Sequence, residues 1–215
     1  MVNCYLVREE DGFTLVDTNL AGSAKAIIAA AREHGGPIVR IVLTHAHNDH
    51  VASLDALKQA LPDVEVAIGA RDARFLAGDM SLDAAEPQVK LRGGYQPCQT
   101  QPTRLLEPGD RVGSLEVVAS PGHTPGHIAL LDGRDRTVIA GDAFQTIGGL
   151  AVAGTMRWLF PFPALATWHR PTALHSARAL QALEPACLAV GHGQVLAEPL
   201  TALDRAISEA EKALQ

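Results

Sequence analysis

The heptapeptide "THAHNDH" at residues 44–50 is the feature that most constrains how this chain folds. It follows the apolar run "IVRIVL" at residues 38–43, which predicts a buried strand ending in a cluster of histidines. His45 and His47 stand two residues apart in extended chain, so their side chains point to the same side and could bind one ion. An N-capping aspartate among surface histidines is the alternative. Because proton transfer and metal ligation are the specialised uses of histidine, the sequence predicts a metal site here.

Three further short sequences place an imidazole or a carboxylate at the end of a predicted strand. They are "SPGHTPGH", "VIAGDA" and "LAVGHG", each with a glycine that leaves room for an ion. Each alone also fits a polar strand terminus. The ends of strands are where an α/β scaffold usually holds its site. The combined set is sufficient for two divalent ions and consists of His45, His47, Asp49, His50, His123, Asp142 and His192.

The order of predicted elements indicates an α/β protein with two sheets packed face to face, as one domain over residues 1–215. Strands and helices alternate up to residue 70, beginning with a hairpin that turns at Asp11-Gly12. Four short strands are expected between residues 109 and 142, and a strand at 187–193 lies between two helices. The expected helices cover residues 21–36, 49–62, 172–185 and 198–215. Residues 78–104, rich in glycine and proline, predict an irregular loop excursion.

Composition excludes several classes of partner. The net charge is −6 and the chain has no cluster of lysine and arginine, which argues against a nucleic-acid surface. No apolar run reaches the roughly 18–20 residues that span a bilayer, and no signal peptide is recognisable. Cys4, Cys98 and Cys187 are scattered and lack CxxC spacing, which fits a reducing compartment. We therefore expect a cytoplasmic protein that binds neither nucleic acid nor membrane.

The order H-x-H-x-D-H, followed by His, Asp and His at strand ends, resembles the metallo-β-lactamase superfamily. The motifs "THAHNDH", "PGHTPGH", "GD" and "GHG" are most similar to its glyoxalase II-like and lactonase-like hydrolase branches. The resemblance implies a four-layer αββα sandwich, with two mixed sheets flanked by helices and the site at one edge. It also implies two metal ions: one bound by His45, His47 and His123, the other by Asp49, His50 and His192, with Asp142 as the bridge.

Two more residues fit supporting roles beside these ligands. Asp17 could hold a ligand histidine, or it could be a helix N-cap or turn residue. His127 could likewise support the site or be an ordinary strand residue. The ligand set without thiolates suits Zn²⁺, Fe or Mn²⁺, and zinc is the default expectation.

The expected activity is hydrolysis of an ester, lactone, thioester or related bond by a metal-bridging hydroxide. Asp49 is the candidate catalytic residue, as a ligand that also takes a proton to the leaving group. A glyoxalase II thioesterase is disfavoured, because only one helix fits after His192. Two alternatives remain: a mononuclear iron persulfide dioxygenase, which shares "THxHxDH", and a non-catalytic binding protein on the same fold.

Residues 144–168 predict a lid or pocket wall. Gly148-Gly149, Pro161 and Pro163 exclude one regular helix or strand there. The segment is aromatic and follows Asp142 directly, so it is expected to cover a small, uncharged or apolar substrate. Packing on the sheet, or a homodimer contact, is the alternative. The residues expected to line the pocket are Trp158, Phe160 and Phe162.

Overall fold

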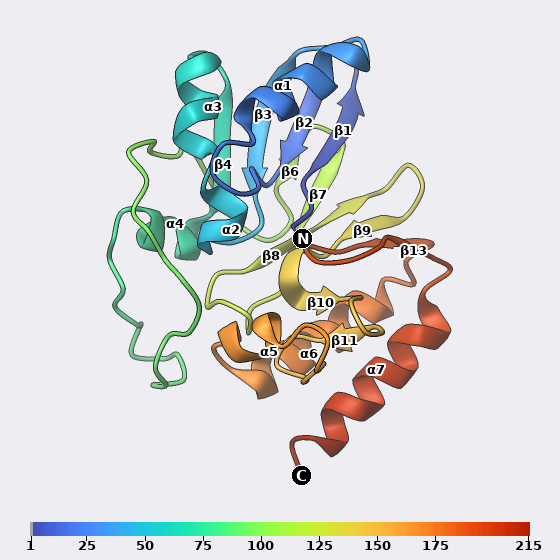
Figure 1. The fold of residues 1–215 in the computed structure, drawn as a ribbon. Helices are drawn as coiled ribbons and strands as arrows, with labels where there is room; N and C mark the ends of the chain where they lie inside the picture. The colour runs from blue at the N-terminus through green and yellow to red at the C-terminus, as the bar shows by residue number, and fades with distance from the viewer. Residues whose placement is uncertain (1) are drawn as a thin grey trace.

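The computed structural model describes residues 2–215, and its first sheet carries the "THAHNDH" sequence at one strand end (Figure 1). The strand order is β1-β2-β3-β4-β5, with β1 antiparallel to β2 and the other neighbours parallel. Parallel pairing brings the carboxyl ends of β2, β3 and β4 to the same edge. The strands are Tyr5–Glu9, Gly12–Val16, Ile38–Leu43, Glu65–Gly69 and Arg104–Leu106.

The second sheet has the order β13-β12-β9-β8-β7-β6 and is mostly antiparallel, with β12 and β9 parallel. Its strands in chain order are Arg111–Val112, Leu115–Ala119, Ile128–Asp132, Thr137–Ile139, Cys187–Ala189 and Leu196–Ala197. A separate antiparallel pair, β10 (Phe144–Gln145) and β11 (Ala151–Val152), follows a short 3₁₀ turn, η1, at Gly141–Ala143. The four short strands expected between residues 109 and 142 are therefore confirmed as β6 to β9.

Helices cover the outer face of each sheet (Figure 1). The first sheet carries α1 (Ala24–Glu33), α2 (Asn48–Val51), α3 (Leu54–Ala60) and α4 (Ala70–Leu76). The second carries α6 (Arg170–Ala182) and α7 (Leu200–Lys212), with the short α5 (Phe162–Ala166) before them. Among residues 2–215, no helix has the length and apolar character needed to cross a membrane.

The apolar side chains form three layers, and strand alternation explains how. On β3, Ile41 and Leu43 pack with α1 and α3, whereas Val42 faces the other sheet. The middle layer joins the two sheets through residues such as Leu115 and Leu130, and the third packs the second sheet on α6 and α7. Three apolar layers separate four layers of secondary structure, so the expected αββα sandwich is confirmed.

Several elements differ from the sequence predictions. The helix expected over residues 49–62 is two helices, because the carbonyl of His50 accepts hydrogen bonds from the backbone and hydroxyl of Thr18 rather than from the next turn. The helix α4 was not predicted. The excursion expected over 78–104 ends at Thr103, since β5 begins at Arg104, and the segment 144–168 contains β10, β11 and α5.

We predict that Leu57→Ala in α3 lowers the free energy of unfolding by about 2–5 kcal/mol, because the side chain is fully buried between the helix and the first sheet. Leu105→Ala, on a side chain 56% exposed, is the matched control and should change stability by less than about 0.5 kcal/mol. Urea unfolding of both variants measures the difference. Equal losses would contradict the packing described here.

Candidate metal centre

The first group of candidate ligands comprises His45, His47 and His123. The first two follow β3 and the third follows β7, so the two sheets contribute to one group at the same edge of the sandwich. All three side chains are buried, and one ring nitrogen from each lies within 4.8 Å of the others. The Nδ1 atom of His47 and the Nε2 atom of His123 are 3.0 Å apart.

The tautomers of these three histidines are fixed by their other ring nitrogens. His47 Nε2 faces the carbonyl oxygen of Arg92 at 3.0 Å, so it donates, and Nδ1 carries the lone pair. His123 Nδ1 faces the hydroxyl oxygen of Thr167, whose own proton goes to a backbone carbonyl. His45 Nδ1 donates to the hydroxyl oxygen of Thr44 at 3.0 Å, because that hydroxyl donates its own proton to Asp17 Oδ2, and His45 Nε2 has no hydrogen-bond partner among the described residues. Three lone pairs thus converge on one point, and two of them face each other at 3.0 Å.

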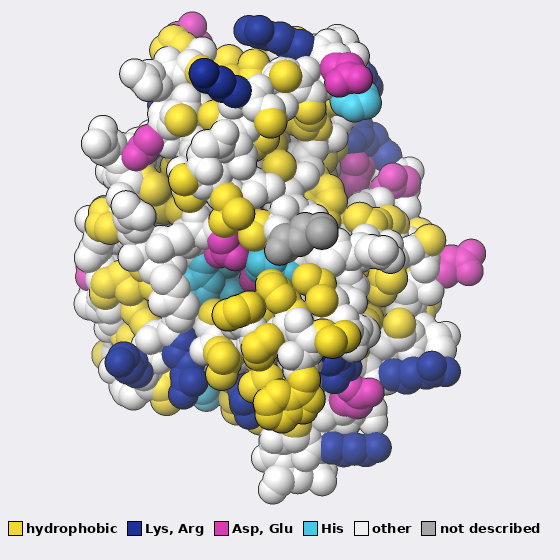
Figure 2. Space-filling view, in the orientation of Figure 1, with side chains coloured by type: hydrophobic (Ala, Val, Ile, Leu, Met, Phe, Trp, Pro, Cys, Tyr) yellow, Lys and Arg dark blue, Asp and Glu magenta, His cyan; other side chains and the backbone are white. Residues whose placement is uncertain are grey.

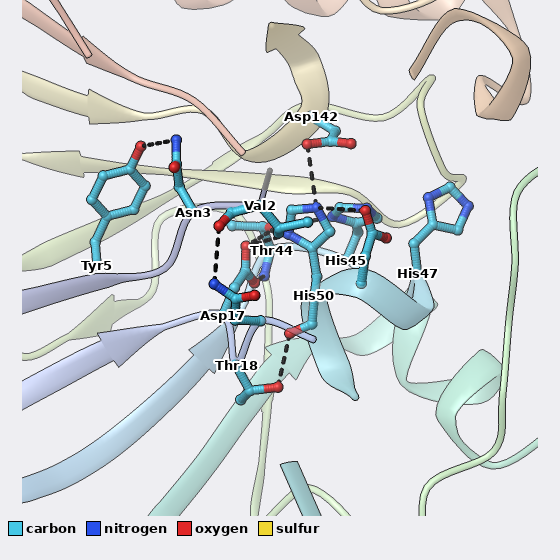
Figure 3. A network of polar contacts seen from close by, with 12 residues as sticks. Val2, Asn3, Tyr5, Asp17, Thr18, Thr44, His45, His47, His50 and Asp142 are labelled. Carbon is cyan, nitrogen blue, oxygen red and sulfur yellow. Dashed lines mark hydrogen bonds and ion pairs between the residues drawn. The ribbon is translucent and has the colours of Figure 1, made fainter. Parts of the chain in front are cut away.

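The second group comprises Asp49 and His50 from α2 and His192 after β12. Asp142, from η1, contacts residues of both groups, and Figure 3 shows its carboxylate facing His50. Its Oδ1 is 3.3 Å from His50 Nε2, and its Oδ2 is 3.1 Å from His192 Nε2 and 3.3 Å from His123 Nε2. Asp49 Oδ2 lies 3.3 Å from His192 Nε2. The structure therefore brings all seven predicted ligand residues together, in the two groups that the resemblance implies.

The donor set and the space around it fit divalent metal ions. Convergent imidazole lone pairs repel one another unless a cation lies between them, and imidazole with carboxylate is a donor set that Zn²⁺, Fe and Mn²⁺ accept. Glycine keeps the site open: a Cβ on Gly191 would lie 2.1 Å from Asp142 Oδ1 and 2.7 Å from His50 Cε1. No larger residue fits there, which agrees with the role expected for the glycines beside these ligands.

Electrostatics divide the histidines into two classes. Burial lowers the pKa of His47 to about 4 and the pKa values of His45 and His123 well below their usual range, so these rings are neutral. Burial also opposes protonation of His192, but the charge of Asp142 and hydrogen bonds to Asp142 and Asp49 outweigh it and raise this pKa to about 10. The charge of Asp142 likewise raises the pKa of His50 well above its usual range, so in the absence of a cation Asp142 holds a proton on His50 and His192, whereas His123 stays neutral.

Asp17 and His127, predicted as supporting residues, both contact candidate ligands. Asp17 Oδ2 accepts a hydrogen bond from His50 Nδ1 at 2.8 Å, which directs His50 Nε2 toward Asp142. Figure 3 shows Asp17 below the histidine cluster and Asp142 above it. His127 Nε2 accepts from the backbone amide of Asp142 at 3.0 Å, and its Nδ1 contacts the hydroxyl of Ser120 at 2.7 Å. Both nitrogens of His127 are thus engaged, so it is a support rather than a ligand.

Asp72 is a buried residue that the sequence analysis missed. It stands in the first turn of α4 and accepts hydrogen bonds from the amide of Ala46 (3.1 Å), the amide of Gly126 (2.7 Å) and the hydroxyl of Thr124 (2.7 Å). It therefore joins the loop of His45 and His47 to the loop of His123. Burial raises its pKa to about 6 despite these donors. A carboxylate three residues after the strand 65–69 was the signal that could have identified it.

A cavity of about 600 Å³ opens onto both groups. Figure 2 shows the histidines and acidic side chains at the bottom of a hollow, with hydrophobic side chains gathered beside it. Phe160 and Phe162 line the cavity, and the Phe160 ring lies 5.0 Å from the His192 ring. Trp158 does not line it. This side chain is 89% exposed, because it lies in a turn that directs it outward, so its predicted place in the pocket wall was wrong.

The comparisons with known proteins agree with this geometry. Residues 1–192 match the metallo-β-lactamase superfamily. The chain belongs to that superfamily. The structure is similar to the crystal structure of TTHA1623 in a di-iron-bound form, with 29% identity, a TM-score of 0.69, and coverage of 94% of this chain and 92% of that one. It is also similar to the DIM-1 metallo-β-lactamase, with 17% identity, a TM-score of 0.73, and coverage of 99% of this chain and 85% of that one. At this low identity, the similarity shows only that the two proteins share a fold.

Sequence relatives extend over most of the chain. The uncharacterized protein YobT of Bacillus subtilis (strain 168) is 50% identical over 98% of this chain and 91% of its own length. The probable metallo-hydrolase YflN of the same organism is 29% identical over 90% and 81%. A hydroxyacylglutathione hydrolase of Rhodopseudomonas palustris (strain BisA53) is 34% identical, but the match covers 64% of this chain and 48% of that enzyme. Two of these three relatives are thus named as hydrolases.

We predict that Asp72→Ala weakens binding of one metal equivalent by about 10–100-fold, because the loops that carry His47 and His123 lose their shared acceptor. The measurement is metal titration of the folded protein with a competing chelator. Asp132→Ala is the control, since that buried carboxylate pairs with Arg134 and contacts none of the candidate ligands. Unchanged affinity in Asp72→Ala would show that the loops hold their positions without it.

Proposed function

We propose that this protein is a dinuclear metal-dependent hydrolase that cleaves an ester, lactone or thioester bond in a small, uncharged or apolar substrate. The observation that carries the proposal is the convergence of ligand atoms. Lone pairs of His45, His47 and His123 meet at one point, Asp49, His50 and His192 meet at a second, and Asp142 contacts residues of both groups.

Each group of residues has a separate task in this proposal. His45, His47 and His123 would hold one divalent ion, and Asp49, His50 and His192 the other, with Asp142 shared. Bound there, a pair of divalent ions supplies Lewis acidity, lowering the pKa of water towards neutral and polarising a substrate carbonyl. Asp49 is the candidate proton carrier: its side chain is 37% exposed and lines the cavity, so it can reach both the site and a leaving group.

The cavity wall supports an uncharged or apolar substrate. Apart from the candidate ligands, the lining consists of apolar side chains and two glycines, and it contains no lysine or arginine among the described residues. The substrate would therefore be held by burial of apolar surface against Phe160, Phe162 and Leu165, with orientation set at the metals. A carboxylate or phosphate on the substrate would find no cation in this wall.

We propose zinc for the two ions, and the di-iron form of the similar protein TTHA1623 makes iron the main alternative.

We propose a cytoplasmic setting as well, in keeping with three cysteines that are all unpaired.

Elemental analysis of the purified protein is expected to give close to two divalent ions per chain. The variants His50→Ala and His192→Ala should each lower the count towards one, because each removes a ligand of the second group. One iron per chain, unaffected by these two substitutions, would overturn the dinuclear proposal and support the persulfide dioxygenase alternative. Two ions without hydrolytic turnover on any ester, lactone or thioester would instead favour a binding protein.

Asp49→Ala is expected to lower turnover by about 10²–10⁴-fold beyond any effect of metal loss, because it removes the proton carrier. The rates should be compared at metal concentrations that keep both proteins fully loaded, as checked by elemental analysis. Asp49→Asn gives a second comparison, since it keeps a ligand oxygen but cannot take a proton. Near wild-type rates in either fully loaded variant would remove Asp49 from the mechanism.

Phe160→Ala is expected to raise KM several-fold for long apolar esters or lactones and less for short ones, because Phe160 lines the cavity beside His192. Trp158→Ala is the matched control, as an aromatic side chain of the same segment that lies outside the cavity. Its KM values should follow the wild type at every chain length. If both variants lost affinity equally for all substrates, the segment would be structural rather than a pocket wall.

A further inference from the structure

A second cavity, of about 290 Å³, is lined by residues that contact His47 and His123 and carries three cationic side chains. We call it the basic pocket, and its defining residues are Lys90, Arg92, Thr167, Trp168, His169 and Arg170. The first two come from the excursion after α4, the next three from the stretch that joins α5 to α6, and Arg170 is the first residue of α6. No aspartate or glutamate lines this pocket among the described residues.

The three cations of the basic pocket are exposed, and no acidic side chain of residues 2–215 neutralises them. Within residues 2–215, Lys90, Arg92 and Arg170 make no ion pair and donate no side-chain hydrogen bond. The chain as a whole has a net charge of −6. Most of its arginines do form ion pairs, namely Arg40, Arg71, Arg74, Arg104, Arg111, Arg134, Arg136, Arg157 and Arg178.

The floor of the basic pocket is built from ordered, buried groups. Trp168 is 5% exposed, and its Nε1 donates to the carbonyl of Val89 at 3.2 Å, which ties the excursion to the stretch before α6. Thr167 is 3% exposed and donates to the carbonyl of Pro163 at 2.7 Å. His169 caps α6 by accepting from the amide of Thr172. The backbone that carries the three cations is therefore held in place around the cavity by these hydrogen bonds.

We propose that the basic pocket binds a small multivalent oxyanion of the phosphate type. Three like charges around one cavity repel one another, and a dianion between them converts that repulsion into attraction. Two guanidinium groups offer paired donors that match the oxygens of a phosphate, and a lysine adds a third cation. The volume suits phosphate itself or the phosphate end of a larger molecule. The apolar cavity at the metals offers no comparable set of cations.

The basic pocket and the metal centre share supporting segments. The carbonyl of Arg92 accepts from His47 Nε2 at 3.0 Å, and the hydroxyl of Thr167 accepts from His123 Nδ1 at 3.1 Å. The backbone amide of Trp168 also donates to the carbonyl of His123. An oxyanion that joins residues 90–92 to residue 170 would hold these two histidines in place. Anion binding is therefore expected to strengthen metal binding as well as thermal stability.

The test compares melting temperatures of the metal-loaded protein in phosphate and in chloride at equal ionic strength. At a phosphate concentration about 100 times Kd, the wild type should melt roughly 5–10 °C higher. The triple variant Lys90→Ala, Arg92→Ala, Arg170→Ala should lose this shift. The control variant Lys25→Ala, Arg32→Ala, Arg205→Ala removes the same charge from exposed cations elsewhere and should keep it.

Isothermal titration with inorganic phosphate and with phenyl phosphate then distinguishes the two sources of the oxyanion. Tighter binding of inorganic phosphate supports a free ion, and tighter binding of phenyl phosphate supports the phosphate group of a larger ligand. A shift retained in the Lys90, Arg92 and Arg170 variant would mean that phosphate binds at the metals, and this would overturn the proposal. Equal melting in phosphate and chloride would overturn it as well.

Discussion

The buried carboxylate of Asp142 is the group on which the arrangement of this molecule depends. It is 3% exposed, and burying a charge is costly unless charged or hydrogen-bonding partners surround it. Here the partners are His50 from the first sheet's helix α2, and His123 and His192 from the ends of β7 and β12. One carboxylate thus requires both halves of the sandwich to meet at the same edge. The neighbouring histidines hold its pKa well below the usual range against the effect of burial.

Three further residues make this edge rigid. Asp17 at the end of β2 directs His50, and His127 holds the backbone of Asp142. Asp72 joins the loops of the two sheets through three hydrogen bonds. Each is buried, and each acts from the end of a strand or the start of a helix rather than from a mobile loop. Preorganisation of this kind keeps ligand atoms close together before any ion arrives.

The segments beside the metal centre face two very different cavities. Most of residues 160–166 line the apolar cavity at the candidate ligands, whereas Ala164 and residues 167–170 line the basic pocket. The excursion contributes to both through Gly93 and Gly94 on one side and Lys90 and Arg92 on the other. A single irregular wall therefore separates a space suited to apolar substrate from a space suited to an oxyanion. Both spaces contact the partners of His47 and His123.

The sequence by itself determined most of the strands and helices and the chemical character of the site. Histidines and aspartates directly after apolar runs indicated the seven residues that the structure brings together, because strand ends gather at one sheet edge. The resemblance to the metallo-β-lactamase superfamily supplied the four-layer arrangement, and the three apolar layers of the structure confirm it.

Tertiary structure decided what depends on distant partners. The break between α2 and α3 follows from hydrogen bonds that Thr18 makes to His50, and no local pattern encodes it. Trp158 lies in a turn and points to solvent, whereas Phe160 packs beside the ring of His192 and lines the cavity. The bridging role of Asp72 and the basic pocket also arise from segments far apart in the chain. Sequence specifies which groups are available, but burial and hydrogen bonding between remote segments decide which atoms they face.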